Sequence, residues 1–158
     1  MKIEEYAEKL RDAHFGELVG EILFREMAIL FPDKAKDFQA LSIVEHFVGN
    51  ALGELLERYQ VRPVEKSRVT EFTGHLLADI QRDDWNGWLL QFREILKPFV
   101  QEFDDLHIHS PTSDLAQLRL LRDHERMLLH YVDLEIAGHN GLSVIQSFLE
   151  SFNYRGGR

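Results

Sequence analysis

Four prolines, at positions 32, 63, 98 and 111, divide the chain of 158 residues into long stretches. Proline interrupts a helix because it lacks a backbone N–H and its ring clashes with the preceding turn. Three of the four prolines fall where the spacing of apolar residues also breaks, whereas that spacing continues past Pro98. The stretches between them are therefore predicted to be long helices, with a kink but no end at Pro98.

Apolar residues recur at steps of three and four along these stretches, which is typical of helices that bury one face. The predicted helices cover about 3–30, 34–60, 68–81, 83 or 84 to 106, 118–136 and 142–152. The first two are expected to be antiparallel neighbours because a short connection joins them. Three polar residues are predicted to cap helix starts. These are Ser67, Asp83 or Asp84, and Ser113.

The order of these helices predicts an all-α fold, most simply a four-helix bundle with one or two additional short helices. The length of the chain suits one domain, which we place at residues 1–152. The remaining residues, 153–158, are predicted to form a frayed C-terminal tail.

Composition limits the classes of function. A net charge of −9 argues against binding to nucleic-acid phosphates, which requires basic patches. No stretch reaches the length of apolar sequence that spans a membrane, and the charged start does not resemble a signal peptide. The chain has no cysteine, which excludes thiolate nucleophiles and thiolate metal sites. We therefore expect a cytoplasmic protein that binds neither nucleic acid nor membrane.

One acidic residue, Glu125, lies on the apolar face of the helix at 118–136. That face is formed by Leu118, Leu121, Leu128, Leu129, Val132 and Ile136. A helical period of 100° per residue places these side chains and Glu125 within one narrow arc, so the carboxylate should point into the protein. An isolated buried carboxylate costs several kcal/mol, so Glu125 is expected to be protonated, paired with a cation or bound to a metal.

The structural alternative is a buried ion pair. Arg122 lies one turn before Glu125, and Arg25 lies on the edge of the apolar face of the first helix. Either guanidinium could neutralise Glu125 without any function being attached to the contact.

The metal alternative requires more carboxylates to converge on Glu125. Glu21 in the first helix and Glu45 in the second lie beside apolar residues and are the candidates. His14 and Glu17 follow the same edge of the first helix as Glu21. Charges that flank an amphipathic helix usually reach solvent, and we expect this of Glu17.

The stretches "GELVGEILFREMA" and "RDHERMLLHYVDLEIAG", together with the order of long helices, resemble the ferritin-like family of four-helix bundles. Members that bind two irons or manganese use a Glu from each of two helices and a Glu-x-x-His from each of two others. The resemblance implies metal-ligand roles for Glu21, Glu45 and Glu125, and iron or manganese as the metal. His124 is a further candidate beside Glu125, although it lies about 100° around the helix.

The chain departs from that pattern because Glu-x-x-His is absent. Val48 follows Glu45 by three residues, and Leu128 follows Glu125 by three. The resemblance therefore implies a degenerate or absent di-metal centre. What remains would either hold at most one loosely bound ion or be a cavity left from a site that the family otherwise uses. Likewise "HERML", from His124 to Leu128, begins like the zinc-protease motif HExxH but lacks its second histidine.

Three functions stay open at the level of sequence. The first is a small binding or accessory protein, most simply a homodimer, that need not be an enzyme. The second is an iron or manganese oxidase or oxygenase that uses Glu21, Glu45 and Glu125, completed by His124 or His14. The third is a heme-oxygenase-like bundle that binds a small organic ligand in a central cavity.

An aromatic stripe on the Trp-rich helix bears on all three functions. It consists of Trp85, Trp88, Phe92, Phe99 and Phe103. It is predicted to be core, and any part left exposed would form a dimer surface or the wall of a pocket for an apolar ligand.

Overall fold

The predicted all-α fold is confirmed in a computed structural model that describes residues 1–152. Among these residues it contains six α-helices and two short 3₁₀ turns, and no strand. The helices are α1 (Ile3–Leu30), α2 (Ala35–Arg58), α3 (Lys66–Ala78), α4 (Trp85–Ile108), α5 (Leu115–Ile136) and α6 (Leu142–Ser151). The turns are η1 (Pro32–Lys34) and η2 (Thr112–Asp114). The predicted tail at 153–158 lies outside the described residues.

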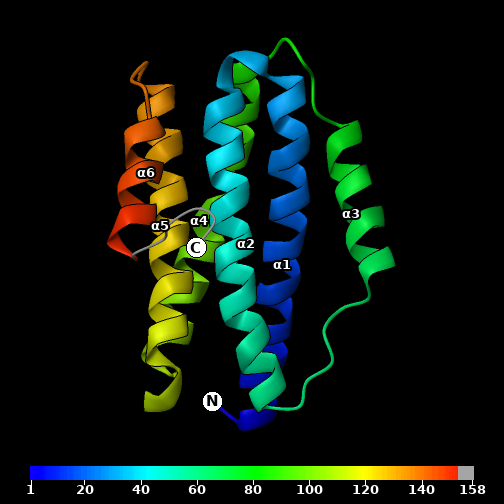
Figure 1. The fold of residues 1–158 in the computed structure, drawn as a ribbon, viewed down its shortest axis with the longest axis vertical. Helices are drawn as coiled ribbons and strands as arrows, with labels where there is room; N and C mark the ends of the chain where they lie inside the picture. The colour runs from blue at the N-terminus through cyan, green and yellow to red at the C-terminus, as the bar shows by residue number, and fades with distance from the viewer. Residues whose placement is uncertain (153–158) are drawn as a thin grey trace.

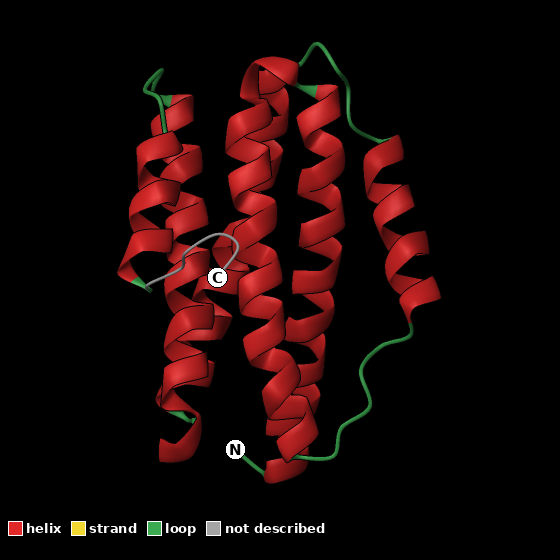
Figure 2. Ribbon diagram, in the orientation of Figure 1, coloured by secondary structure: helices red, strands yellow, loops and turns green. Residues whose placement is uncertain are grey.

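Consecutive helices run in opposite directions, as Figures 1 and 2 show. α1 packs along α2 as the predicted antiparallel pair, and α4 packs along α5 as a second pair. The two pairs meet where α2 contacts α5. The shorter helices lie outside them, with α3 beside α1, and α6 against α5 and α2 (Figure 1).

Of the three predicted helix caps, the structure confirms one. Asp84 caps α4, since its side chain accepts a hydrogen bond of 2.9 Å from the backbone N–H of Gly87. The predicted caps at Ser67 and Ser113 are wrong. The N-cap residue of α3 is Glu65, that of α5 is Asp114, and neither side chain makes a capping hydrogen bond. The buried carboxylate of Asp114 accepts hydrogen bonds from Tyr6 and Tyr59 instead.

α4 continues through Pro98, as the uninterrupted apolar spacing predicts. The start of α4 contributes a cluster of rings to the core, where Trp88 stacks on Phe92 at a centroid distance of 4.8 Å and Trp85 stacks on Trp88 at 5.4 Å. Among the helices of residues 1–152, none combines the length and apolar character that a membrane crossing needs.

Two glycines allow α1 and α2 to approach each other where the chain places acidic residues. A Cβ atom on Gly20 of α1 would lie 2.8 Å from the carboxyl carbon of Glu45 on α2. Reciprocally, a Cβ atom on Gly49 of α2 would lie 3.4 Å from the Cβ of Glu17 on α1. Each helix therefore offers a glycine opposite the glutamate of its partner, and both glutamates are enclosed by the helix pair.

Candidate metal centre

Four ionisable side chains from three helices meet in the interior. Glu17 comes from α1, Glu45 from α2, and His124 and Glu125 from α5. All four are buried, and His124 has no exposed surface. Nε2 of His124 lies 2.8 Å from Oε1 of Glu17, 3.4 Å from Oε2 of Glu125 and 3.6 Å from Oε2 of Glu45. One imidazole nitrogen thus faces three carboxylates.

A hydrogen bond to the backbone fixes the imidazole of His124. Its Nδ1 donates to the carbonyl oxygen of Leu121, one turn earlier in α5. A carbonyl can only accept, so Nδ1 carries a hydrogen and Nε2 is left to face the carboxylates. The ring also stacks on Phe103 of α4, with centroids 6.4 Å apart.

The polar atoms at the centre are incompletely satisfied. Nε2 of His124 has no hydrogen-bond partner of suitable geometry, although Oε1 of Glu17 lies 2.8 Å from this nitrogen. Oε2 of Glu17 also has no hydrogen-bond partner. Buried polar atoms normally have partners, so these two atoms are open to a further ligand.

The charges of the cluster perturb one another. Burial raises the pKa of Glu125 to about 7, against a smaller lowering by the charge of His124. Burial and the charge of Glu17 raise the pKa of Glu45 well above its ordinary value. Burial would lower the pKa of His124, but the carboxylates of Glu17 and Glu45 reverse this effect and raise it. The cluster therefore retains protons unless another cation replaces them.

The structure revises the residues predicted from sequence. It brings together Glu45, His124 and Glu125. Glu21 is not with them, since its carboxylate forms ion pairs with Arg25 at 3.2 Å and with His46 at 3.1 Å near the surface. Glu17, expected to reach solvent, is 3% exposed and takes that place in the cluster.

The structure does not place Arg122 or Arg25, the arginines of the ion-pair alternative, in a pair with Glu125. Arg122 pairs with Asp123 at 2.8 Å, and Arg25 pairs with Glu21. The Arg122 side chain stays partly exposed, which costs less than burying its charge beside Glu125. Among residues 1–152, the recorded charge partner of Glu125 is His124.

His14, the other histidine considered as a ligand, is buried but lies apart from the converging group. Its Nδ1 has no hydrogen-bond partner, and burial lowers its pKa. It sits over the backbone of α2, where a Cβ atom on Gly53 would lie 3.7 Å from its Nε2. His14 therefore belongs to the helix interface, where burial favours its uncharged form.

A cavity of about 730 Å³ opens onto the carboxylates of the cluster. Helices α1, α3 and α4 supply most of its wall, and Glu17, Glu45 and Glu125 belong to its lining. The predicted aromatic stripe is divided between core and cavity, since Trp88, Phe92, Phe99 and Phe103 also line it. The volume falls in the range of small-molecule sites.

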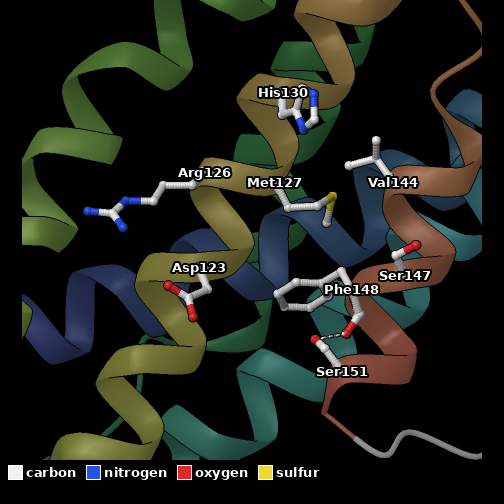
Figure 3. A pocket seen from close by; sticks show the side chains of 8 residues that line it. All are labelled: Asp123, Arg126, Met127, His130, Val144, Ser147, Phe148 and Ser151. Atoms are coloured by element: carbon white, nitrogen blue, oxygen red, sulfur yellow. Dashed lines mark hydrogen bonds between the residues drawn. The ribbon is translucent and has the colours of Figure 1, made fainter.

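A second hollow lies between α5 and α6, and Figure 3 shows the residues around it. Its charged groups are engaged elsewhere: Arg126 extends away from α6 and pairs with Asp104 at 2.7 Å, and Asp123 pairs with Arg122. Ser151 donates to the carbonyl of Phe148 at 2.7 Å. None of the ionisable residues that line this hollow is buried.

Comparison with known protein families, with curated proteins and with solved structures finds no match to the chain. The candidate site therefore rests on its own geometry.

Proposed function

We propose that the protein binds one divalent metal ion through Glu17, Glu45 and His124, with Glu125 beside them. The observation that carries the proposal is the orientation of His124. Its Nδ1 is committed to the carbonyl of Leu121, and its Nε2 faces three carboxylates without a hydrogen-bond partner. A backbone carbonyl that holds the other ring nitrogen is a usual way to orient a histidine ligand.

The charge of the cluster supports a cation at this place. Three buried carboxylates need compensation, and none of the residues that line the adjoining cavity is lysine or arginine. Two partly buried cationic side chains are paired with other acids, Lys34 with Glu135 and Arg122 with Asp123. Protons or a metal ion are the cations that remain, and a metal would displace the protons.

The spacing of the ligands suits a single ion. Glu17, Glu45 and His124 each offer one ligand atom, and these atoms lie within 4.8 Å of one another. Ligands about 2.0–2.2 Å from a common ion are separated by at most about 4.4 Å, so small side-chain movements would close the site. Among residues 1–152, this is the only such group of three possible ligands, which favours one metal rather than two.

The donor set favours iron or manganese. Carboxylate oxygens suit manganese and ferrous iron, and one imidazole is compatible with both ions. We propose this site as the degenerate form of a ferritin-like di-metal centre, with Glu17 in the position that the sequence assigns to Glu21. The homodimer and the cytoplasmic location stay predictions.

Two roles use the same site. In a binding or accessory protein the ion is structural, whereas in an oxidase or oxygenase it would supply oxygen activation. The oxidase or oxygenase role is kept as the alternative because of the cavity. The cavity reaches the carboxylates of Glu17, Glu45 and Glu125 and would bring an organic molecule to them.

Metal analysis of purified protein tests the proposal. Protein reconstituted with iron or manganese and freed of excess metal should contain about one equivalent per chain. Glu17→Gln removes an anionic ligand with little change of shape and should reduce the content below about a tenth of an equivalent.

Glu21→Gln is the matched control, since it neutralises a glutamate one turn further along α1 that lies outside the cluster. This variant should keep the metal content of the original chain. Circular dichroism of both variants checks that the helices are intact. A metal-free original chain, or equal loss in both variants, would contradict the proposed site.

A further inference from the structure

The charged residues that line the large cavity all have the same sign. Glu17, Glu45 and Glu125 lie at its inner end, and Asp12, Asp79 and Glu102 complete the acidic set. The lining contains no lysine, arginine or histidine. Protons or a bound cation would neutralise the inner cluster, and Asp12, Asp79 and Glu102 would still leave the cavity negative, so it attracts cations and repels anions.

The exposure of the lining residues distinguishes the mouth from the interior. Asp12 and Asp79 are exposed, and the rings of Phe72 and Phe99 are 47% and 43% exposed. Trp88, Phe92 and Leu96 are buried deeper in the wall. The mouth thus combines carboxylates with aromatic rings, and the wall behind it is apolar.

This arrangement specifies a class of ligand. Aromatic ring faces and carboxylates are the groups that bind ammonium ions, and an apolar wall binds hydrocarbon. We infer that the cavity binds an apolar amine, with its ammonium group at an exposed acid of the lining, Asp12 or Asp79, and its hydrocarbon body among α1, α3 and α4. The proposed metal site is not required for this binding, because the mouth residues are separate from the ligand set.

A matched series of ligands tests the inference. Decylamine, decanol and decanoate each have about ten carbons in one unbranched chain and differ in charge at neutral pH. Isothermal titration at about 0.15 M salt should give the tightest binding for decylamine, about tenfold or more tighter than decanol, and the weakest for decanoate. The fluorescence of Trp88 in the cavity wall should change on binding. Decanoate binding as tightly as decylamine, or no binding by any of the three, would overturn the inference.

Two comparisons, each of a variant with its control, locate the ligand. Asp12→Asn with Asp79→Asn should weaken decylamine about tenfold and leave decanol unchanged. The control, Glu8→Gln with Asp83→Asn, removes two exposed acids that do not line the cavity. It should leave decylamine binding within about twofold of the original chain. If the control double variant weakened decylamine as much as the cavity double variant, net charge alone would explain the attraction, and an ammonium site at the mouth would be rejected.

The second comparison uses a variant that fills part of the cavity. Gly16 is an exposed helical glycine of the lining, and a Cβ atom added there meets no heavy atom within 4 Å. Gly16→Phe should therefore fold and reduce the binding of both decylamine and decanol. Gly74→Phe is the control, because Gly74 has equally open surroundings on α3 but does not line the cavity. Unchanged binding in Gly16→Phe would place the ligand elsewhere.

Repeating the titration with metal-free protein separates the two proposals. Decylamine should bind with or without the metal, so a failed metal analysis would leave the ligand inference intact. Loss of decylamine binding in the metal-free chain would overturn the assignment of the ammonium group to the mouth.

Discussion

Buried polar residues join helices that are distant in the sequence, and Asp114 is the best connected of them. Its side chain is fully buried before α5 and accepts hydrogen bonds from the hydroxyls of Tyr6 in α1 at 2.7 Å and of Tyr59 after α2 at 2.6 Å. Arg58 also donates to it. One carboxylate therefore joins the ends of three long helices by accepting hydrogen bonds from two hydroxyls and a guanidinium.

Asp114 is predicted to stabilise the fold in a pH-dependent way. Burial by itself would raise the pKa of this carboxyl, but hydrogen bonds from Tyr59, Tyr6, Ser113 and Arg58 outweigh burial and lower it. Because the pKa in the folded protein is below the unfolded value, the stabilisation is present above the unfolded pKa and is lost as the pH falls through the folded one.

Urea unfolding of Asp114→Asn checks this prediction. The substitution should lower the free energy of unfolding by about 2–4 kcal/mol at neutral pH, because it removes the charge that Arg58 and the two tyrosines bind. The difference from the original chain should narrow below about pH 4. Asp83→Asn, at an exposed site, should change the free energy by less than about 0.5 kcal/mol. A deficit that does not depend on pH would assign the effect to shape rather than to charge.

At the scale of elements, the helices were predictable because their signals are local. The spacing of apolar residues, the prolines and the cap at Asp84 all act within a few residues of the helix that they define. The predicted cap at Ser67 is wrong because α3 begins one residue before it, at Lys66. The predicted cap at Ser113 is wrong because η2 and the buried Asp114 shape that connection through contacts with distant tyrosines. Long-range contacts of this kind leave no mark in the local sequence.

The rotation of α1 about its axis was not predictable, and this explains the exchange of Glu17 for Glu21. α1 packs against both α2 and α3 and also lines the cavity, so its apolar residues spread around the helix and define no narrow face. Glu45 and Glu125 were placed correctly beside the interior because α2 and α5 have clearer apolar faces. A usable sign for Glu17 was present in Gly20 and Gly49, since a Cβ atom at either position would meet the glutamate of the facing helix.

His124 was underestimated for a different reason. Its backbone position lies about 100° from that of Glu125, so a helical projection separates the two residues. The hydrogen bond from Nδ1 to the carbonyl of Leu121 turns the ring along the helix and brings Nε2 to the cluster. Rotamer and hydrogen bond decided the position, and neither can be read from residue spacing.

α3 is predicted to be the least stable helix around the cavity. Of its thirteen residues only Val69 and Thr73 are buried, and it packs on α1. Few buried contacts mean a low free energy of local opening. Amide hydrogen exchange should therefore be about tenfold or more faster in α3 than in the middle of α2.

Decylamine should slow exchange in α3, since Phe72 and Leu76 of this helix line the cavity that the amine is proposed to fill. α6, also a short outer helix, is the internal control because it lies on the other side of the protein (Figure 1). Exchange in α6 should not respond to the amine. Equal protection of both helices would indicate general stabilisation instead of binding beside α3.

At the scale of the whole molecule, the proposed metal site joins its two main helix pairs. Glu17 and Glu45 belong to the pair α1 and α2, whereas His124 and Glu125 belong to the pair α4 and α5. An ion held by both sets can bind only when the pairs are together, and the unfolded chain cannot assemble them. Metal binding should therefore stabilise the complete fold and not one helix alone.

Unfolding in urea with increasing manganese measures this coupling. The free energy of unfolding should rise with the logarithm of the metal concentration and gain about 2.7 kcal/mol when free metal is about a hundredfold above its Kd. Glu17→Gln should abolish the gain, and Glu21→Gln should retain it, since Glu17 contacts His124 whereas Glu21 pairs with Arg25. Each comparison is made within one variant, with and without metal, so that any effect of a substitution on the metal-free fold cancels. A gain of the same size in both variants would mean that manganese acts at another site, and the two helix pairs would then be held together by their apolar contacts alone.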